Sequence, residues 1–484
     1  MNYSKRLFLF SFLPLASVSL CGCQDAKWVE PTFEKGDGIS FVAYAGPTVE
    51  NWNGVVKNVE CVTEHNFSKL SEAGFDRVIA LYEGATSNGS TLEETLQKKA
   101  DKANKDAMKV LEQAEKFGID YYARDWSFYG MTQNNSYFRK EGIDNAKAIE
   151  DALKIVFSSS SEYLHSPSYR GNFCFDEPVY DELPLLGDLV DAYLSRMKEL
   201  GVQGEPMVNL NPIYVSGPAM GGHSYSEYLD RYIEYVGKKI GYISYDFYPF
   251  MGVDGSYIRS MYLANLEVAA QKCQENGIEL RTFIQAMGDF TGIRDLTSIA
   301  DFRFQVYTNL AFGSKAMTYY CYANEKSASE GSFALFNYID GTYNYTYDLA
   351  KKVNNEIHAF EDALTPYTWS GVLYHNANEL YDNQNFMNLT SPLESHPRVS
   401  IQSGTEDTLL STFKHEENGD DSFLLLNFSD PYFNKEDKVT LQFKDAKALL
   451  MYRFGQKMIA GLPKDGTYTF NLYPGEGRYI IPLK

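Results

Sequence analysis

Eight short apolar runs alternate with helical stretches between residues 38 and 365 of the 484-residue chain, and this alternation constrains the fold most strongly. Each run has the composition of a strand buried on both faces and ends in polar residues, Gly or Pro. Eight successive strand–helix units are the number that closes a parallel barrel. The chain is therefore predicted to contain a (β/α)8 TIM barrel. The runs lie at residues 38–47, 75–84, 118–128, 170–178, 204–214, 241–250, 278–288 and 316–325.

Amphipathic segments separate these runs, and several of them end in Gly, as expected for a helix C-terminal cap. A doubly wound open sheet is the alternative arrangement of such units. No Gly-rich phosphate-binding loop follows the first run, and this favours the barrel. The helical segments are predicted at residues 94–118, 183–201, 225–237, 264–277, 297–313 and 346–364.

The character of the chain changes after about residue 365. Short strand-like runs follow one another there, separated by turns rich in Asn, Asp and Gly, without helical segments between them. This pattern predicts an antiparallel β-sandwich over residues 366–484. The barrel is accordingly assigned to residues 38–365.

The first residues form a basic and then apolar segment that is interrupted by Pro14 and is short for a membrane span. It ends in a Leu-Cys-Gly-Cys sequence that resembles a bacterial lipobox, with Cys23 as the lipidated residue. We therefore expect a signal peptide over 1–22, a linker over 23–37 and an exported protein anchored by lipid to a periplasmic or cell-surface membrane face. The alternative is an ordinary secretory signal with an incidental cysteine.

Charge and cysteine content exclude several classes of partner. Lys and Arg total 44 against 64 Asp and Glu, a net charge of −20, and no long basic run occurs, so nucleic acid is not an expected partner. The cysteines are scattered, without a CxxC pair or a zinc-type cluster. No metal or cofactor is predicted.

Reacting groups in such a barrel come from the carboxyl ends of the strands and the loops after them. The predicted strand ends carry carboxylates, amides and aromatic rings, with no His and almost no Lys. This lining suits a neutral, polyhydroxylated ligand, because amides and carboxylates accept hydroxyl hydrogen bonds and aromatic faces stack on sugar rings. We therefore expect a carbohydrate partner. The candidate residues are Asp125, Trp126, Asp176, Glu177, Asn209, Asp246, Tyr248, Gln285, Tyr322 and Glu325.

Three of these segments resemble a known group of enzymes. The Asp176-Glu177 pair at the end of the fourth run is similar to the acid/base position of the clan A glycoside hydrolases, where the pair is usually Asn-Glu. SYDFYPF (244–250) and FRFQVYTNLAFGSKAMTYYCY (302–322) resemble segments of family 42 β-galactosidase-like barrels. The resemblance implies a glycoside hydrolase of a glycan or oligosaccharide, with Glu177 as general acid/base.

The chain departs from that pattern at two positions. Asp176 replaces the Asn, and its negative charge is expected to raise the pKa of Glu177 and so help that carboxyl stay protonated. Gln285 stands where these enzymes carry their nucleophilic Glu on the seventh strand, and an amide is no useful nucleophile.

Three interpretations follow from these departures. In the first, Glu177 works with a second carboxylate: Asp246 is preferred because it ends a strand on the same rim, and Glu325 or Asp125 is the alternative. In the second, the 2-acetamido group of the substrate attacks while Asp176 orients it, so that no nucleophile is needed on the seventh strand. In the third, the protein is a non-catalytic glycan-binding surface lipoprotein.

Overall fold

The computed structural model describes residues 27–28, 38–49, 60–80, 83–85, 87–129, 145–252, 255–288, 292–324, 334–377 and 383–484. The predicted signal peptide, the predicted lipidation site Cys23 and the candidate Glu325 lie outside these residues. No helix within the described ranges is both long enough and apolar enough to cross a membrane.

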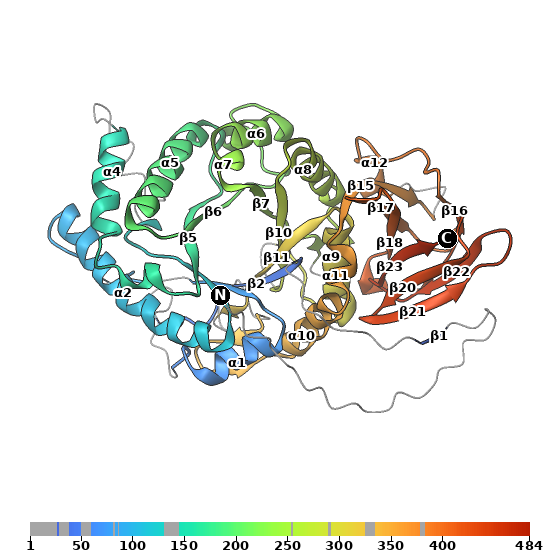
Figure 1. The fold of residues 1–484 in the computed structure, drawn as a ribbon, viewed down its shortest axis with the longest axis horizontal. Coiled ribbons are helices and arrows are strands. Elements are labelled where there is room, and N and C mark those ends of the chain that lie inside the picture. The colour runs from blue at the N-terminus through green and yellow to red at the C-terminus, as the bar shows by residue number, and fades with distance from the viewer. Residues whose placement is uncertain are drawn as a thin grey trace.

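Eight parallel strands form one sheet in the order β6-β5-β4-β3-β2-β11-β10-β7. The two end strands of that order also meet, since Leu210 bridges Tyr245 in parallel and its N–H donates to the carbonyl of Ser244 at 2.8 Å. The sheet therefore closes into the ring of strands seen in Figure 1, and the predicted TIM barrel is confirmed. Its strands are β2 (Ser40–Tyr44), β3 (Arg77–Ile79), β4 (Asp120–Ala123), β5 (Tyr169–Asp176), β6 (Glu205–Asn209), β7 (Tyr242–Asp246), β10 (Glu279–Gln285) and β11 (Ser314–Tyr320).

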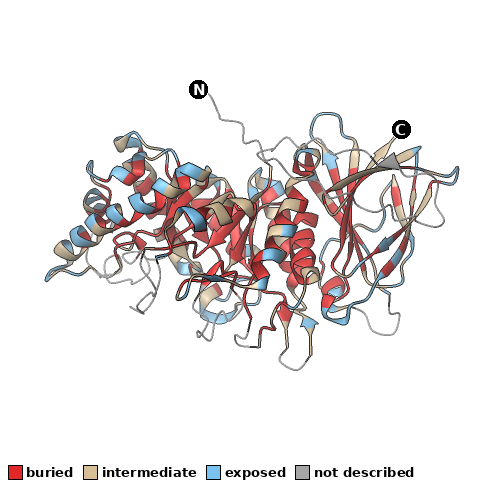
Figure 2. Cartoon of the chain, turned by 90° about the horizontal axis from the view of Figure 1, so that it is seen from below, coloured by how far each residue is buried: buried red, intermediate tan, exposed pale blue. Residues whose placement is uncertain are grey.

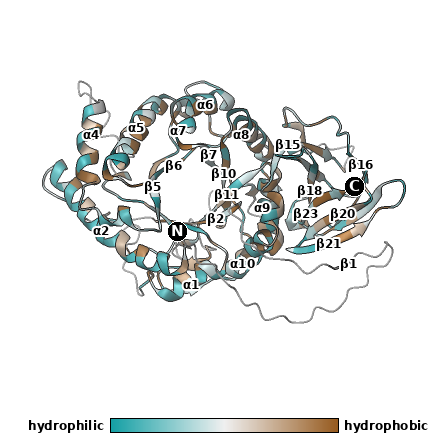
Figure 3. Cartoon of the chain, in the orientation of Figure 1, coloured by the Kyte–Doolittle hydropathy of each residue, from teal (hydrophilic) through white to brown (hydrophobic). Residues whose placement is uncertain are grey.

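Helices surround this ring (Figure 1), and their outer sides carry many hydrophilic residues (Figure 3). Their apolar sides cover the outer face of the strands, so the region between the strands and the helices is buried (Figure 2). The helices are α1 (Glu64–Glu72), α2 (Leu92–Phe117), α4 (Asn145–Val156), α5 (Leu183–Leu200), α6 (Tyr225–Tyr232), α7 (Lys238–Ile240), α8 (Tyr262–Asn276), α9 (Ile299–Ala311), α10 (Tyr345–His358) and α11 (Glu361–Leu364).

The ends of these helices follow from their sequences. The hydroxyl of Thr91 accepts the N–H of Glu94 at the start of α2, and Gly118 takes the left-handed conformation at its end. At the start of α9, Ser298 and Asp301 form a capping box. The segment predicted as one helix at 225–237 instead runs from α6 into a π-helix at Ile233–Gly237 and then into α7.

The C-terminal part of the chain consists of two antiparallel sheets whose facing apolar side chains form a separate core cluster. The larger sheet has the order β1-β21-β20-β23-β18-β17-β15, and the smaller has the order β16-β19-β22. This arrangement confirms the predicted β-sandwich. The strands are β1 (Lys27–Trp28), β15 (Tyr367–His375), β16 (Val399–Ser403), β17 (Thr408–His415), β18 (Asp421–Asn427), β19 (Asp437–Phe443), β20 (Ala448–Arg453), β21 (Gln456–Gly461), β22 (Thr467–Leu472) and β23 (Gly477–Leu483), with the short helix α12 (Gln384–Met387).

The barrel and the sandwich share apolar packing. Phe304 of α9 lies 5.1 Å from Phe428, centroid to centroid, and Phe360 stacks on Tyr479 of β23 at 5.8 Å. These residues belong to one buried cluster that runs from the barrel helices into the larger sheet of the sandwich. The domain boundary between residues 365 and 366 stays a prediction.

Short strands complete the structure. β12 (Ala323–Asn324), β13 (Phe336–Asn337) and β14 (Thr342–Tyr343) form a small sheet after the last barrel strand. β8 (Phe250–Met251) and β9 (Tyr257–Ile258) form a two-stranded antiparallel ribbon after β7. The N–H of Phe250 donates to the side chain of Gln285, the last residue of β10, so the ribbon lies at the carboxyl end of the barrel.

Candidate active site

Three carboxylates lie at the carboxyl ends of neighbouring strands. Asp176 ends β5 and is followed directly by Glu177, and Asp246 ends β7. The strand between them, β6, ends at Asn209. The strand-end rule used on the sequence therefore brings these four predicted residues to one part of the barrel rim.

The amide of Asn209 holds two of the carboxylates in place. Its Nδ2 donates to Oδ1 of Asp246 at 3.0 Å and to Oδ1 of Asp176 at 3.3 Å. Its own Oδ1 accepts the hydroxyl of Ser244 at 3.2 Å, which fixes the orientation of the amide. Because an amide nitrogen has two hydrogens, Asn209 can serve both carboxylates at once.

Glu177 has a backbone conformation that is rare for a residue with a side chain. Its φ is +48°, in the left-handed region, which costs about 1–3 kcal/mol for a residue other than Gly. The surroundings hold it there, since its N–H donates to the carbonyl of Asn209 at 2.9 Å and its carbonyl accepts Nδ2 of Asn211 at 3.1 Å. The Glu177 side chain is exposed at this end of the barrel, while the Asp246 side chain is 8% exposed.

The three carboxylates disfavour one another's ionised forms. Burial, followed by the charges of Glu177 and Asp176, raises the pKa of Asp246 well above its ordinary value. The enclosing protein and the charge of Asp176 raise the pKa of Glu177 as well. Burial also raises the pKa of Asp176, but Arg124 and the amide of Asn209 oppose this shift. The group therefore retains a proton at a pH where an ordinary carboxylate has lost its own.

Arg124 was not predicted from the sequence, although it directly follows β4. Its guanidinium is buried and lies 4.0 Å from the ring centroid of Tyr129 and 4.9 Å from that of Phe173. Its Nη1 donates to the hydroxyl of Tyr44 at 2.6 Å. A buried cation thus accompanies the carboxylates, and its position next to Asp125 in the chain was the available signal.

The side chains of the neighbouring candidates Asp125 and Trp126 lie in different surroundings. Asp125 is buried and accepts the N–H of Ser127 at 2.8 Å and the hydroxyl of Tyr163 at 3.2 Å. Burial raises its pKa to about 6. These contacts place Asp125 in the layer between strands and helices. Trp126 is half-buried and lies 5.6 Å from Tyr129, on the side of Arg124.

An aromatic wall flanks the carboxylates. The predicted residue Tyr248 lies 5.4 Å from Tyr320, whose ring is 5.2 Å from that of Tyr44. The charge of Asp246 contributes to raising the pKa of Tyr248, after burial, which indicates their proximity. The predicted residue Tyr322 is instead fully buried between Phe75 and Phe336. Tyr320, two residues earlier, contributes to the wall and was not predicted.

Gln285 is fully buried, and its side-chain amide is hydrogen-bonded to other groups of the protein. Its Nε2 donates to the carbonyls of Met287 at 3.0 Å and Arg294 at 2.8 Å, and its Oε1 accepts the N–H of Phe250 at 3.3 Å. Both N–H groups of this amide are donated to the protein, so it has none left for a ligand. Gln285 therefore acts here as a support of the rim, and its predicted role in substrate binding stays a prediction.

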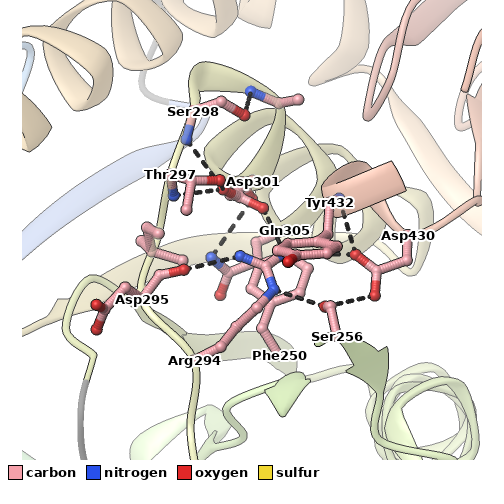
Figure 4. Close-up of polar contacts among 12 residues, drawn as sticks. Phe250, Ser256, Arg294, Asp295, Thr297, Ser298, Asp301, Gln305, Asp430 and Tyr432 are labelled. Atoms are coloured by element: carbon pink, nitrogen blue, oxygen red, sulfur yellow. Dashed lines mark hydrogen bonds and ion pairs between the residues drawn. The ribbon is translucent and has the colours of Figure 1, made fainter. Parts of the chain in front are cut away.

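The residues that Gln285 supports form an ionic cluster between the barrel and the sandwich (Figure 4). Nη2 of Arg294 lies 2.6 Å from Asp301 at the start of α9 and 3.4 Å from Asp430 of the sandwich. Nε of Arg294 donates to the hydroxyl of Ser256 at 2.6 Å, and that hydroxyl donates to Asp430 at 2.6 Å. We call Ser256, Arg294, Asp301 and Asp430 the Arg294 cluster. It ties the β8–β9 ribbon to both parts of the molecule.

No family model and no curated protein matches the chain. Among solved structures, the chain is similar to a β-galactosidase from the psychrophilic Marinomonas ef1 (TM-score 0.47, 11% identity over 68% of this chain), and it spans 62% of that protein. It is similar to the GH51 arabinofuranosidase from Xanthomonas axonopodis pv. citri (TM-score 0.46, 8% identity), covering 93% of this chain and 97% of that one. It is also similar to a glucosidase from Croceicoccus marinus (TM-score 0.43, 10% identity), covering 93% and 99%. Because these TM-scores lie below 0.5, we derive a function from the geometry of the site alone.

Proposed function

We propose that the protein is a glycoside hydrolase in which Glu177 and Asp246 are the two catalytic carboxylates. The observation that supports this is the gathering of Asp176, Glu177 and Asp246 at the ends of β5 and β7, with Asn209, at the end of β6 between them, bonded to two of the three. Glycoside hydrolysis requires one protonated carboxyl for the leaving oxygen and one carboxylate as base or nucleophile. A group of repelling carboxylates that retains a proton meets this requirement.

We assign the acid/base role to Glu177. Its side chain is exposed, so a leaving-group oxygen can reach it, and its raised pKa favours the protonated form. Asp246 is buried and held by Asn209, which suits a group that must face the anomeric carbon in a fixed position. Positive charge developing on the sugar favours ionised Asp246, and the proton of the pair then resides on Glu177.

The test compares wild type, Glu177→Gln and Asp246→Asn on aryl glycosides of several sugars, including 2-acetamido sugars, with good and poor leaving groups. Removing a general acid typically costs 10²–10⁴-fold in rate, roughly, and costs least when the leaving group needs no proton. We therefore expect Glu177→Gln to lose far more activity on poor leaving groups than on good ones. Asp188→Asn, an exposed carboxylate on α5, is the matched control and should behave as wild type.

Three outcomes would change this proposal. Equal losses of Glu177→Gln on good and poor leaving groups would remove Glu177 from the acid role. A larger loss for Asp176→Asn than for Asp246→Asn, confined to 2-acetamido substrates, would favour attack by the substrate's own acetamido group. Binding of glycans without any release of sugar would favour the non-catalytic interpretation.

We also propose that the protein is exported and lipid-anchored through Cys23, on the strength of its lipobox-like sequence. Cells fed a radiolabelled fatty acid should incorporate label into the wild-type protein. Cys23→Ser should incorporate none, and label that persists in this variant would refute the anchor.

A further inference from the structure

The β8–β9 ribbon carries an arginine, Arg259, on the face turned away from the Arg294 cluster. Phe250 belongs to the other face, since the guanidinium of Arg294 lies 4.3 Å from the centroid of its ring (Figure 4). Successive side chains on a strand point to opposite faces, so Met251 lies on the face of Arg259. Nη2 of Arg259 contacts the sulfur of Met251 there, at 3.2 Å. The N–H of Arg259 donates to the carbonyl of Pro249 at 2.8 Å, which fixes its backbone close to the end of β7.

Two aromatic rings connect Arg259 to the carboxylates of the site. Its guanidinium lies 4.1 Å from the ring centroid of Tyr214 and 5.7 Å from that of Phe247, the residue directly after Asp246. The rings of Tyr214 and Phe247 are 5.2 Å apart. Burial and then the charge of Asp246 raise the pKa of the Tyr214 phenol to about 12, and Arg259 opposes that shift. Asp246 and Arg259 therefore both act on one phenol, and they lie at the same part of the barrel rim.

The charge of Arg259 lacks an anionic partner within the described ranges. Arg294, on the other face of the ribbon, is paired with Asp301 and Asp430. Arg259 is half-buried, and among the described residues it forms no ion pair with a carboxylate. Its Nη2 faces a thioether sulfur, which is a weak acceptor, although a guanidinium has five N–H donors. A cation in these surroundings retains the capacity to bind an oxyanion from a ligand.

We infer that Arg259 binds an anionic substituent of the glycan, a uronic acid carboxylate or a sulfate ester, next to the bond that Glu177 and Asp246 cleave. This inference rests on the proposed function, because it takes those two carboxylates as the point of cleavage. A guanidinium binds planar oxyanions through two parallel hydrogen bonds. The phenol of Tyr214, which stays protonated, is a further donor beside it.

The proposed ligand also accounts for the placement of a cation at an acidic rim. The three carboxylates of the site repel an anionic substrate, and Arg259 is a positive charge that offsets this repulsion at one position. A neutral glycan needs no such charge. The substrate class is therefore an acidic glycan, and Arg259 determines the preference for it over the neutral form.

The test measures binding without cleavage. Glu177→Gln protein is run through native gels that contain polygalacturonate or alginate, each beside its carboxyl-reduced form, and carrageenan beside its desulfated form. The net charge of −20 opposes non-specific retention by a polyanion, so retardation in these gels reports a specific site. We expect at least one anionic polymer to retard the protein more than its neutral form does, and its chemistry distinguishes a carboxylate from a sulfate.

Arg259→Met, added to the Glu177→Gln background, should weaken that retardation about tenfold or more, as expected for the loss of a hydrogen bond between charged groups. Arg259→Lys keeps the charge without the planar fork and should retain part of the retardation. Arg398→Met is the matched control, because it removes an exposed arginine of the sandwich and changes the net charge equally. It should leave retardation unchanged. Equal circular dichroism spectra and melting temperatures confirm that the variants are folded.

The outcomes separate this inference from the proposed function. The inference is refuted if none of the three anionic polymers retards the protein, if each neutral form retards it equally, or if Arg259→Met is retarded like its background. Hydrolysis of neutral aryl glycosides that depends on Glu177 would still uphold the proposed function in each case. Retardation that depends on Arg259, in a protein that releases no sugar from any substrate, would uphold the anion site and refute hydrolysis.

Discussion

Asp176 differs from its two acidic neighbours in having a buried cation close to it. Arg124 and the amide of Asn209 oppose the rise that burial imposes on the pKa of Asp176. The ionised form of Asp176 in turn raises the pKa of both Glu177 and Asp246. A single guanidinium, held between aromatic rings, therefore influences how protons are distributed over the whole group.

Replacing Arg124 by Met should shift the acidic limb of the pH–activity profile, which reports the ionisation of Asp246, to lower pH. Without the cation Asp176 keeps its proton to higher pH, so its charge no longer raises the pKa of Asp246, and Asp246 ionises at lower pH. The measurement is kcat/KM against pH. Arg124→Lys retains the charge and should keep the limb close to that of wild type. An unmoved limb in Arg124→Met, with the fold intact by thermal melting, would contradict the role given to Arg124.

Asp246→Asn should stabilise the protein at neutral and alkaline pH. Burial, Glu177 and Asp176 raise the pKa of Asp246 in the folded state, so the folded protein binds this proton more tightly than the unfolded chain does. The stability that protonated Asp246 contributes to the folded protein is fully present below the pKa of about 3.9 of an unfolded Asp. It is lost as the pH rises through the higher pKa of the folded state. The Asn variant carries no charge and avoids that loss.

The measurement is the melting temperature at about pH 3, below the pKa of an unfolded Asp, and at rising pH up to about pH 9. The variant should gain over wild type at the higher pH and show little difference at the lower one. Asp188→Asn, whose carboxylate is exposed, should show no such pH-dependent gain. A gain of equal size at both pH values would contradict the electrostatic explanation.

The sequence predicted the acidic residues of the candidate site and Asn209, which is bonded to two of them, but not Arg124 or Tyr320. Glu177 and Asp246 could be found because a strand end in a barrel fixes the height of a residue at the rim. A strand end does not fix the direction of the side chain, so Tyr320 was overlooked while the buried Tyr322 was chosen. Likewise Gln285 ends β10, yet its amide turns toward the backbone of the rim.

Among the elements, the β8–β9 ribbon depends most on a few polar contacts. It has two residues in each strand, too few to be stable alone, and the Arg294 cluster fixes one of its faces. Within that cluster Asp301 also accepts the N–H groups of Thr297 and Ser298 at the start of α9. One arginine therefore serves a helix terminus, a ribbon and the sandwich.

Arg294→Met should destabilise the protein by about 3–5 kcal/mol, the usual cost of removing one partner from a buried ion pair. Its side chain is 5% exposed and that of its partner Asp301 is 0% exposed, so the remaining carboxylate would be left buried without its cation. Urea unfolding gives the free energy. Arg398→Met is the control, because its ion pair with Asp445 is exposed and should contribute less than about 1 kcal/mol. Similar losses for the two variants would contradict this account.

The elements of the barrel were largely predictable. Strands buried on both faces appear in the sequence as continuous apolar runs, and each of the eight barrel strands overlaps one of them. The β8–β9 ribbon was not predicted, and its first residue, Phe250, was included in the sixth run, because strands of two residues produce no periodic pattern in the sequence. The π-helix at Ile233–Gly237 was also missed, since its apolar pattern continues that of α6.

For the molecule as a whole, the shared core joins the barrel to the sandwich. The buried cluster that contains Phe304 and Phe360 also contains Phe428 and Tyr479. The hydroxyl of Thr390 and its N–H both bond to Glu267 of α8, at 2.7 and 2.6 Å, and add a polar connection. An interface that is both apolar and hydrogen-bonded resembles the interior of one domain more than a contact between two mobile ones.

The protein should therefore unfold in a single thermal transition. Removal of the sandwich would expose Phe304 of α9 and Phe360, which pack on it, so neither part is expected to retain its structure while the other is unfolded. Scanning calorimetry should give a calorimetric enthalpy equal to the van't Hoff enthalpy. Two resolved transitions, or a soluble and cooperatively folded fragment of residues 38–365, would show that the parts are independent.

The closure of the barrel has a practical consequence. Its ring of strands is joined between β6 and β7 at Leu210 and Tyr245, one residue away from Asn209 and Asp246. Asn209 can hold Asp246 only when those two strands have met. A chain whose ring is still open contains every residue of the site but no assembled site. After refolding, the recovered specific activity would therefore count the molecules whose barrel has closed.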